Sequence, residues 1–175
     1  NSAMKIAFTG AHGVGKTTLS EQIAGYLPGY LLLPEPFLQL EEKGHTFTYP
    51  PQAEDFSEQL RYSIEQTDID ETDVIFDRCP LDLLAYLYAT GNIGETQRFY
   101  TRVREAMEEI DLLVFVPVEN PDVIDSSTTT FPELRKKVND LLQEWITDFD
   151  TETIRVQGTP RQREEQLLRR ISELI

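Results

Sequence analysis

Short apolar runs alternate with amphipathic stretches along the chain. The apolar runs are bounded by turn-forming or polar residues, which is typical of buried strands, and the amphipathic stretches place apolar residues on one face at helical spacing. The runs predict strands over residues 4–9, 30–33, 73–78, 111–117 and 153–156. The amphipathic stretches predict helices over residues 18–27, 37–43, 53–67, 80–91, 95–109, 131–146 and 160–174. This alternation indicates one parallel sheet with helices on both faces.

A glycine-rich motif lies between the first predicted strand and the first predicted helix. Residues 10–17 read Gly-Ala-His-Gly-Val-Gly-Lys-Thr, which matches G-x-x-x-x-G-K-[ST], the pattern of a phosphate-binding loop. Glycines let the backbone turn around a phosphate, and the N–H groups and the start of the helix attract its charge. A glycine-rich turn that binds nothing would not explain the Lys-Thr pair at this offset. The candidate nucleotide-binding residues are Gly10, His12, Gly13, Val14, Gly15, Lys16, Thr17 and Thr18.

Two side chains of this loop carry chemistry beyond the backbone. The Lys16 ammonium is predicted to bridge the β- and γ-phosphates of ATP, and the Thr17 hydroxyl is predicted to bind Mg²⁺. His12 either touches a phosphate or fills a variable position of the loop. ATP and Mg²⁺ are therefore the expected cofactors.

Charged residues follow the second and third predicted strands. Glu35 lies between two prolines and is the candidate general base or hydroxyl ligand, with an exposed loop glutamate as the alternative. Asp77 stands at the strand end where P-loop proteins hold Mg²⁺. Arg78 is predicted to bind a phosphate or the substrate, or else to close the strand with a salt bridge. Cys79 is interpreted as a packing residue, because no histidine lies near it in the sequence.

The carboxyl ends of parallel strands meet at one edge of a sheet. A strand order of 2-3-1-4-5 would bring Glu35 and Asp77 to the same edge as Lys16. We therefore predict an α/β fold, the three-layer sandwich of P-loop NTPases, with a five-stranded parallel sheet. The candidate catalytic residues are Lys16, Glu35, Asp77 and Arg78, and the candidate metal ligands are Thr17 and Asp77.

The loop between the last strand and the last helix is predicted to lie level with the phosphate-binding loop. The run Thr159-Pro160-Arg161-Gln162 forms a capping box with proline at the first helical position, so a helix begins there. We expect the adenine base of the nucleotide to pack against Gly158, Thr159 and Pro160.

The length of the chain corresponds to about one domain. Residues 4–175 contain no internal repeat or low-complexity segment and are interpreted as a single domain. The irregular polar stretch at about 118–130 has the length and composition of a lid. Residues 1–3 precede a methionine and are interpreted as a cloning remnant.

Composition narrows the class of partner. The net charge is −15, and residues 54–73 hold eight acidic residues against one arginine, which argues against a polymeric nucleic acid. A small phosphorylated ligand remains compatible, because backbone N–H groups and a few local cations suffice to bind it. The single cysteine and the lack of a long apolar run predict a soluble, cytoplasmic protein without a membrane partner.

Three motifs together resemble a known family. The phosphate-binding loop, Pro34-Glu35-Pro36 and the run Asp77-Arg78-Cys79-Pro80-Leu81-Asp82 are similar to those of P-loop kinases of small molecules. The likeness is to AAA-type ATP-binding proteins similar to the ribosylnicotinamide kinase domain. The glutamate after the second strand and the acidic residue and arginine after the third also resemble the deoxynucleoside kinases.

This resemblance implies a role for each matching residue. Lys16 and Thr17 would bind the phosphates and Mg²⁺. Glu35 would deprotonate the acceptor hydroxyl, and Arg78 would position the substrate. Asp77 stands where the deoxynucleoside kinases have a glutamate.

The predicted lid departs from the pattern of these kinases. Related kinases carry one or more arginines in the lid, whereas residues 118–130 contain neither arginine nor lysine. Arg135 and Lys136 on the following helix are the nearest substitutes. If neither reaches the γ-phosphate, Lys16 and Mg²⁺ alone would stabilise the transferring phosphoryl group.

Two functions are compatible with these features. The favoured one is a kinase that transfers the γ-phosphoryl group of ATP to a hydroxyl of a small nucleoside-like metabolite. The alternative is a nucleotide-dependent ATPase or switch module that acts on a protein partner. No guanine-binding Asn-Lys-x-Asp motif occurs, and Asp77 is followed by an arginine rather than by a glutamate that could activate water. A closed, substrate-sized cavity beside Glu35 would favour the kinase, and an open, flat surface the switch.

Overall fold

Five parallel strands form one sheet at the centre of the molecule. The computed structural model describes residues 3–49, 51–119 and 131–175. The strands are β1 (Lys5–Thr9), β2 (Leu31–Leu33), β3 (Val74–Phe76), β4 (Leu112–Phe115) and β5 (Thr153–Arg155). Their order is β2-β3-β1-β4-β5 and every pairing is parallel, so the predicted topology is confirmed.

The register of the sheet brings the carboxyl ends of the strands together. Leu33 of β2 is level with Phe76 of β3, and Thr9 of β1 is level with Phe115 of β4. One residue beyond β3, the N–H of Asp77 still donates to the carbonyl of Leu33 at 3.1 Å. The loops that follow these strands therefore start at one edge, which is the edge where such sheets bind ligands.

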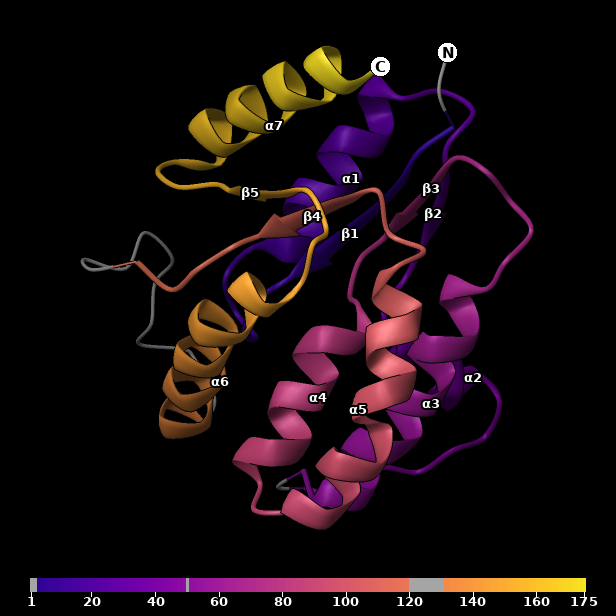
Figure 1. The fold of residues 1–175 in the computed structure, drawn as a ribbon, viewed down its shortest axis with the longest axis vertical. Helices are drawn as coiled ribbons and strands as arrows, with labels where there is room; N and C mark the ends of the chain where they lie inside the picture. The colour runs from indigo at the N-terminus through magenta and orange to yellow at the C-terminus, as the bar shows by residue number, and fades with distance from the viewer. Residues whose placement is uncertain (1–2, 50, 120–130) are drawn as a thin grey trace.

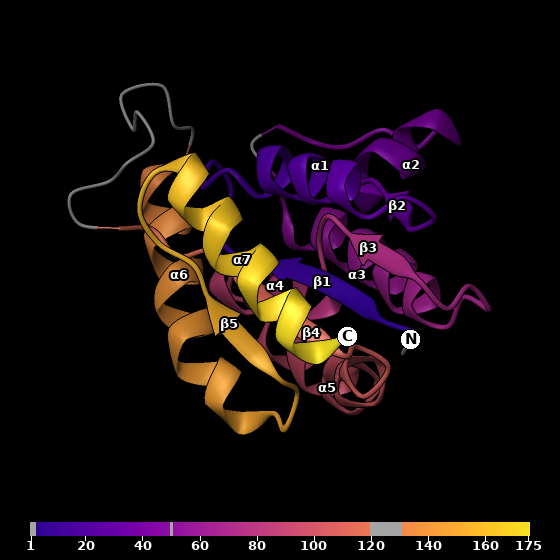
Figure 2. The ribbon, with the colours of Figure 1, turned by 90° about the horizontal axis from the view of Figure 1, so that it is seen from above.

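Seven α-helices cover the sheet within the described residues. They are α1 (Lys16–Tyr26), α2 (Pro36–Glu42), α3 (Ala53–Thr67), α4 (Pro80–Ala89), α5 (Ile93–Met107), α6 (Pro132–Trp145) and α7 (Pro160–Leu174). The helices α1 and α7 pack together on one face, whereas α3, α4, α5 and α6 lie on the other and α2 packs against α3 (Figure 1). Figure 2 shows α7 in front of the sheet and α4 behind it. The predicted three-layer sandwich is confirmed.

The helix α4 lies in the middle of its layer and is apolar on almost every side. It packs against α3, α5 and α6, and eight of its ten residues are buried. A helix that is apolar all round belongs in the interior of a protein. Two polar residues, Asp82 and Tyr86, are buried together with its leucines. Such residues need polar partners, and both of them find theirs at the carboxyl edge of the sheet.

Side chains at the helix starts explain where two helices begin. The predicted capping box is confirmed, because Gln162 N–H donates to Thr159 Oγ1 at 3.2 Å and Thr159 N–H donates to Gln162 Oε1 at 2.8 Å. The helix α5 begins at Ile93 rather than at residue 95, because the Asn92 side chain accepts the N–H of Glu95. A short 3₁₀ turn that the sequence did not predict, η2 (Ile146–Asp148), follows α6.

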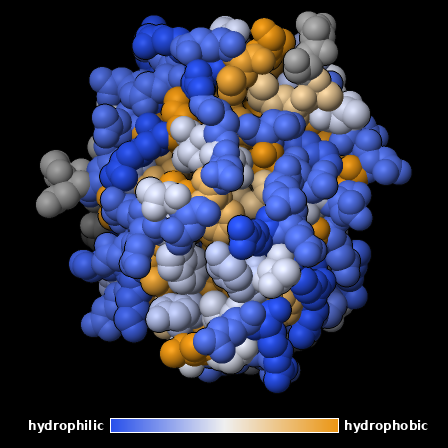
Figure 3. Space-filling model, in the orientation of Figure 1, coloured by the Kyte–Doolittle hydropathy of each residue, from blue (hydrophilic) through white to orange (hydrophobic). Residues whose placement is uncertain are grey.

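The outer surface is rich in charged and polar side chains. The face shown in Figure 3 is mostly hydrophilic, in agreement with the net charge of −15. Among the helices in the described part of the chain, none combines the length and the apolar character that crossing a bilayer requires. The predicted lid-like segment lies outside the described residues, except for Val118 and Glu119.

Candidate active site

The P-loop, residues 10–17, joins β1 to α1 at the carboxyl edge of the sheet. A Cβ atom on Gly10 would lie 2.5 Å from the carbonyl oxygen of Val116, so no side chain fits between the loop and the chain that leaves β4. Gly15 has a φ of +95°, which lies in the left-handed region that favours glycine. The loop can therefore curl closely in front of the amino terminus of α1, where helix N–H groups attract anions.

The Lys16 ammonium is buried against this loop. Its Nζ donates hydrogen bonds to the carbonyl oxygens of Gly10 at 2.9 Å and of Ala11 at 2.7 Å, and the residue is only 4% exposed. Burial, together with the nearby Arg78 guanidinium, lowers the pKa of Lys16 to about 8. A buried cation of this kind is stabilised by an incoming anion, because the anion supplies the charge compensation that water no longer gives.

Oxygen atoms of Thr17, Ser20 and Asp77 lie together beside the start of α1. Thr17 Oγ1 donates to Asp77 Oδ2 at 2.8 Å, and Ser20 Oγ donates to Asp77 Oδ1 at 3.4 Å. Burial raises the pKa of Asp77, and the hydrogen bond from Thr17 opposes that shift. Mg²⁺ in nucleotide sites is held by one or two protein oxygens together with substrate phosphates. The hydroxyl and carboxylate of Thr17 and Asp77 fit this requirement.

Arg78 lies between two carboxylates at the same edge of the sheet. Its Nε is 3.6 Å from Glu35 Oε1 and 3.6 Å from Asp82 Oδ2. Burial opposes the charge of Arg78, but Asp82, Tyr86 and Glu35 outweigh burial and raise its pKa. Neither Arg78 Nε nor Asp82 Oδ2 has a hydrogen-bond partner within the described residues. Arg78 thus pairs with Glu35 and Asp82 rather than with its neighbour Asp77, and its Nε–H still lacks a hydrogen-bond acceptor.

Asp82 is fully buried and joins the start of α4 to Arg78. Its Oδ1 accepts the N–H of Cys79 at 3.1 Å, and burial raises the pKa of its carboxyl to about 6 although Arg78 opposes the shift. Burial also raises the pKa of the Cys79 thiol to about 12. A thiol with that pKa is almost entirely protonated at neutral pH, in agreement with the packing role predicted for Cys79.

A cavity of about 370 Å³ opens beside Glu35 and Arg78. Its walls are largely aromatic: Phe56 stacks on Tyr86 with ring centres 4.9 Å apart, and the rings of Phe37 and Phe47 stack at 4.8 Å. The lining comes from the P-loop, α2, α3, α4 and α6 and the loops that join them. It comprises His12, Glu35, Phe37, Phe47, Thr48, Pro51, Asp55, Phe56, Gln59, Arg78, Tyr86, Phe131 and Leu134. A volume of this size suits a small-molecule ligand.

A family model described as an AAA domain matches residues 5–163. The chain belongs to this family. The matched range begins in β1 and ends in α7, so it contains the P-loop, the residues at the ends of β2 and β3 and the whole cavity lining.

Solved structures with the same fold as this AAA domain include two kinases and NadR protein. Deoxyadenosine kinase from M. mycoides, with the products dCMP and dCDP, has a TM-score of 0.68 at 17% identity and covers 98% of this chain and 100% of its own. Thymidylate kinase from Ehrlichia chaffeensis has a TM-score of 0.68 at 16% identity, and the match covers 98% of this chain and 99% of that structure's chain. NadR protein in complex with NR has a TM-score of 0.69 at 13% identity, and the match covers 98% of this chain and 50% of the NadR chain. No curated protein matches the sequence.

The predicted adenine-binding loop of the AAA domain lies on the other side of the P-loop from the aromatic cavity. A smaller cavity of about 90 Å³ there is lined by Gly15, Thr18, Leu19, Gln22, Pro160 and Arg163. The N–H of Gly158 donates to Glu119 Oε1 at 2.9 Å. Pro160 therefore lies beside Gly15 of the P-loop and Thr18 of α1.

Two buried arginines hold the P-loop from its carbonyl side. Arg135 donates from Nε to the carbonyl of His12 at 2.9 Å and from Nη2 to that of Gly13 at 3.0 Å. Arg163 donates from Nη1 to the carbonyl of Val14 at 2.6 Å. In a trans peptide the C=O group and the N–H group of the following residue point in opposite directions. Because the arginines hold the carbonyls on one side of the loop, the N–H groups of these peptides point to the other side. The two arginines are 5% and 3% exposed.

Of the two arginines, Arg135 was predicted from the sequence as a candidate and Arg163 was not. Of the two substitutes for lid arginines, Arg135 contacts the P-loop, whereas Lys136 is exposed and pairs with Asp140 at 2.8 Å. Arg163 was missed, because an arginine on an amphipathic helix is usually a surface residue. It also donates to the carbonyl of Gly158 and pairs with Glu119, so it connects the P-loop to the loop before α7.

We expect Arg163→Ala to destabilise the AAA domain by roughly 3 kcal/mol. The change removes the cation that pairs with Glu119 at 2.6 Å, and it leaves the carbonyl of Val14 without this donor. Arg161→Ala is the matched control, because Arg161 lies on the same helix, its side chain is 89% exposed, and within the described part of the chain it pairs with Glu165 alone. Its expected effect is below about 0.5 kcal/mol. Urea unfolding of both variants checks this, and equal effects would contradict it.

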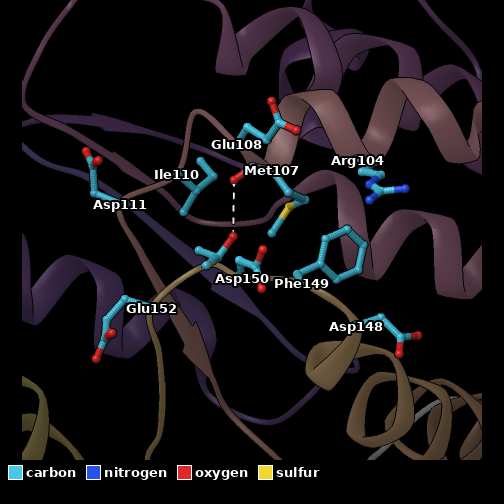
Figure 4. Close-up of a pocket in the computed structure, with 10 residues that line it drawn as sticks. Arg104, Met107, Glu108, Ile110, Asp111, Asp148, Phe149, Asp150 and Glu152 are labelled. Carbon is cyan, nitrogen blue, oxygen red and sulfur yellow. Dashed lines mark hydrogen bonds between the residues drawn. The ribbon is translucent and has the colours of Figure 1, made fainter.

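A third cavity, of about 400 Å³, lies at the opposite edge of the sheet, where β4 and β5 begin. Its lining holds five carboxylates and one arginine, and the side chains of Glu108, Asp111 and Asp148 point away from one another in Figure 4. No group of three or more His, Cys, Asp and Glu that could hold a metal ion is found in the described ranges of the chain. We assign no function to this cavity.

Further residues of the site escaped sequence analysis, among them Ser20, Gln59, Asp82 and Tyr86. Asp82 and Tyr86 are four residues apart and share one face of α4, and Arg78 precedes Asp82 by the same spacing, which was the available signal. Gln59 and Ser20 carried no signal, because a polar residue in an amphipathic helix is expected on the solvent side.

Proposed function

We propose that this AAA domain is a kinase that transfers the γ-phosphoryl group of ATP to a hydroxyl of a small nucleoside-like metabolite. The observation that carries this proposal is the cavity of about 370 Å³ beside the P-loop, which is lined by both Glu35 and Arg78. A hydrolase, or a switch that acts on a protein, needs no pocket for a second small molecule. The fold shared with deoxyadenosine kinase and thymidylate kinase supports the same class of reaction.

On the phosphate side, Lys16 and the N–H groups of the P-loop hold the β- and γ-phosphates. Phosphoryl transfer depends mainly on positioning and electrostatic stabilisation, and an ammonium that is already buried needs little reorganisation. Thr17 and Asp77 would hold Mg²⁺, which when bound neutralises phosphate charge. Arg135 adds a further positive charge at the carbonyl side of the loop.

On the acceptor side, Glu35 takes the proton of the hydroxyl that attacks the phosphoryl group. Its side chain is 27% exposed and lines the cavity, within 3.6 Å of Arg78. Arg78 orients this carboxylate through the ion pair. Arg78 also lines the cavity, so its guanidinium stands beside the bound acceptor.

A nucleoside with a planar base suits the lining of this cavity. Flat aromatic ligands stack on aromatic walls such as those formed by Phe56 and Phe37. Gln59 is 6% exposed and lines the cavity, and its side chain makes no hydrogen bond to any residue that the structure describes. A carboxamide presents a donor beside an acceptor, which complements the hydrogen-bonding edge of a base.

Acceptor-dependent turnover of ATP tests this proposal. With Mg²⁺ present, we expect ADP release to rise only with a matching member of a panel of deoxyadenosine, deoxycytidine, thymidine and nicotinamide riboside. Gln59→Leu is expected to lower kcat/KM for that acceptor by about 10- to 100-fold, because one edge of the base loses its hydrogen bonds. KM for ATP is expected to stay unchanged, because Gln59 does not line the smaller cavity beside Gly15 and Pro160.

Gln97→Leu serves as the matched control, because Gln97 is an exposed glutamine on α5. It is expected to behave as wild type with every acceptor. ATP hydrolysis that ignores all acceptors, and that is unchanged in Gln59→Leu, would contradict the kinase and support the hydrolase or switch instead.

A further inference from the structure

Tyr86 connects the P-loop to the acceptor cavity. Its Oη accepts the backbone N–H of His12 at 2.6 Å and lies 2.7 Å from Nδ1 of the His12 ring. Tyr86 is 2% exposed, and it lines the cavity together with His12. One hydroxyl of α4 thus contacts two atoms of a single P-loop residue.

The ring of Tyr86 packs among residues of the acceptor cavity. Phe56 stacks on it with an angle of 21° between the ring planes, and the Arg78 guanidinium lies 5.2 Å from the ring centre. Arg78 in turn pairs with Glu35. A ligand in the cavity therefore touches the same packed side chains that hold His12.

The hydrogen bonds at Tyr86 define what His12 contributes. Because Oη accepts the N–H of His12 and also contacts Nδ1, the His12 N–H is not offered to a phosphate. The carbonyl of His12 is held by Arg135 at 2.9 Å. Both the N–H and the C=O of His12 are therefore bound to helices, to α4 and to α6, and the N–H groups from Gly13 onward are left to bind the phosphates.

We infer that Tyr86 is a positioning residue that couples the two substrates of the proposed kinase. An acceptor in the cavity holds the Tyr86 ring in place, and the Tyr86 hydroxyl then holds the P-loop in the shape that binds the triphosphate. Coupling of this kind is reciprocal, so ATP also tightens acceptor binding. This inference rests on the proposed function.

Binding of AMP-PNP with Mg²⁺, measured by calorimetry with and without a saturating nucleoside, tests the coupling. Deoxyadenosine, thymidine and nicotinamide riboside serve in turn as the nucleoside. In the wild type we expect the matching nucleoside to tighten AMP-PNP binding about 5-fold or more. Tyr86→Phe keeps the ring and removes the hydroxyl, so we expect the nucleoside to give no tightening of AMP-PNP binding in this variant.

Tyr88→Phe is the matched control, because it removes a hydroxyl from the same helix at a residue that is 40% exposed and lies outside the cavity lining. It is expected to show the same tightening of AMP-PNP binding by the nucleoside as the wild type. If Tyr86→Phe fails to fold, His12→Ala replaces it, because it removes the Nδ1 contact without altering α4. If the nucleoside tightens AMP-PNP binding less in His12→Ala than in the wild type, the inference is supported.

Tightening that is unchanged in Tyr86→Phe, or in His12→Ala where that variant is used, overturns the inference. The kinase proposal then still stands, because acceptor-dependent turnover is measured separately on the wild type. Absence of such turnover overturns the proposed function, and this inference with it.

Discussion

Lys16→Ala is expected to lower acceptor phosphorylation by at least about 10³-fold while the protein stays folded. Burial lowers the pKa of Lys16 to about 8, so its charged form destabilises the fold by roughly 3 kcal/mol at neutral pH. This penalty applies below pH 8 and is relieved as the pH rises from there toward the unfolded value. Because the substitution removes the penalty, the urea midpoint at neutral pH is expected to stay the same or to rise. ADP release and urea unfolding measure the two effects.

Lys137→Ala is the control for this variant, because Lys137 is an exposed lysine on α6. Neither its activity nor its stability is expected to change. Phosphorylation near the wild-type rate in Lys16→Ala would show that the P-loop is not the phosphate site. A large loss of stability would show that the ammonium serves the fold through its bonds to Gly10 and Ala11.

Glu35→Gln is expected to lower kcat by about 10²- to 10⁴-fold, because an amide does not accept the proton of the acceptor hydroxyl. The fold should tolerate the change. Glu35 caps α2 without a side-chain hydrogen bond, and its 3.6 Å contact with Arg78 is longer than a hydrogen bond. KM for ATP is expected to stay unchanged, because the phosphates bind at Lys16. Steady-state kinetics with the matching acceptor measure both constants.

Glu42→Gln changes an exposed glutamate at the other end of α2 and is expected to match the wild type. A kcat close to the wild-type value in Glu35→Gln would show that another group takes the proton. Loss of acceptor phosphorylation together with unchanged ATP hydrolysis would be the strongest support for Glu35 as the base, because hydrolysis of ATP by water does not require a base in the acceptor site.

The strands could be predicted because they are buried on both faces. Residues 111–117 read as a continuous apolar run, and all four residues of β4 within it are at most 2% exposed. A strand covered by helices on both sides has no polar face, so its sequence differs clearly from that of the amphipathic helices around it. Helix starts were less certain, since α5 begins where the side chain of Asn92 caps it.

Part of the site followed from the topology of the sheet. Glu35 and Asp77 come shortly after the ends of two strands, and the carboxyl ends of parallel strands lie at one edge of the sheet. Gln59 and Tyr86 lie within helices, and nothing in their neighbourhoods in the sequence indicates a cavity. Their place in the site depends on how α3 and α4 pack, which is decided by side chains of the whole layer.

By itself, the sequence determined the P-loop, the order of strands and helices and the charged residues at the strand ends, because these depend on local patterns and on the handedness of the connections. Only the tertiary structure decided that Arg135, rather than Lys136, reaches the P-loop and that Arg163 holds Val14. Arg163 and Val14 are 149 positions apart in the chain. Helical spacing shows which residues share a face, but the loop that this face meets is set by the packing of distant segments.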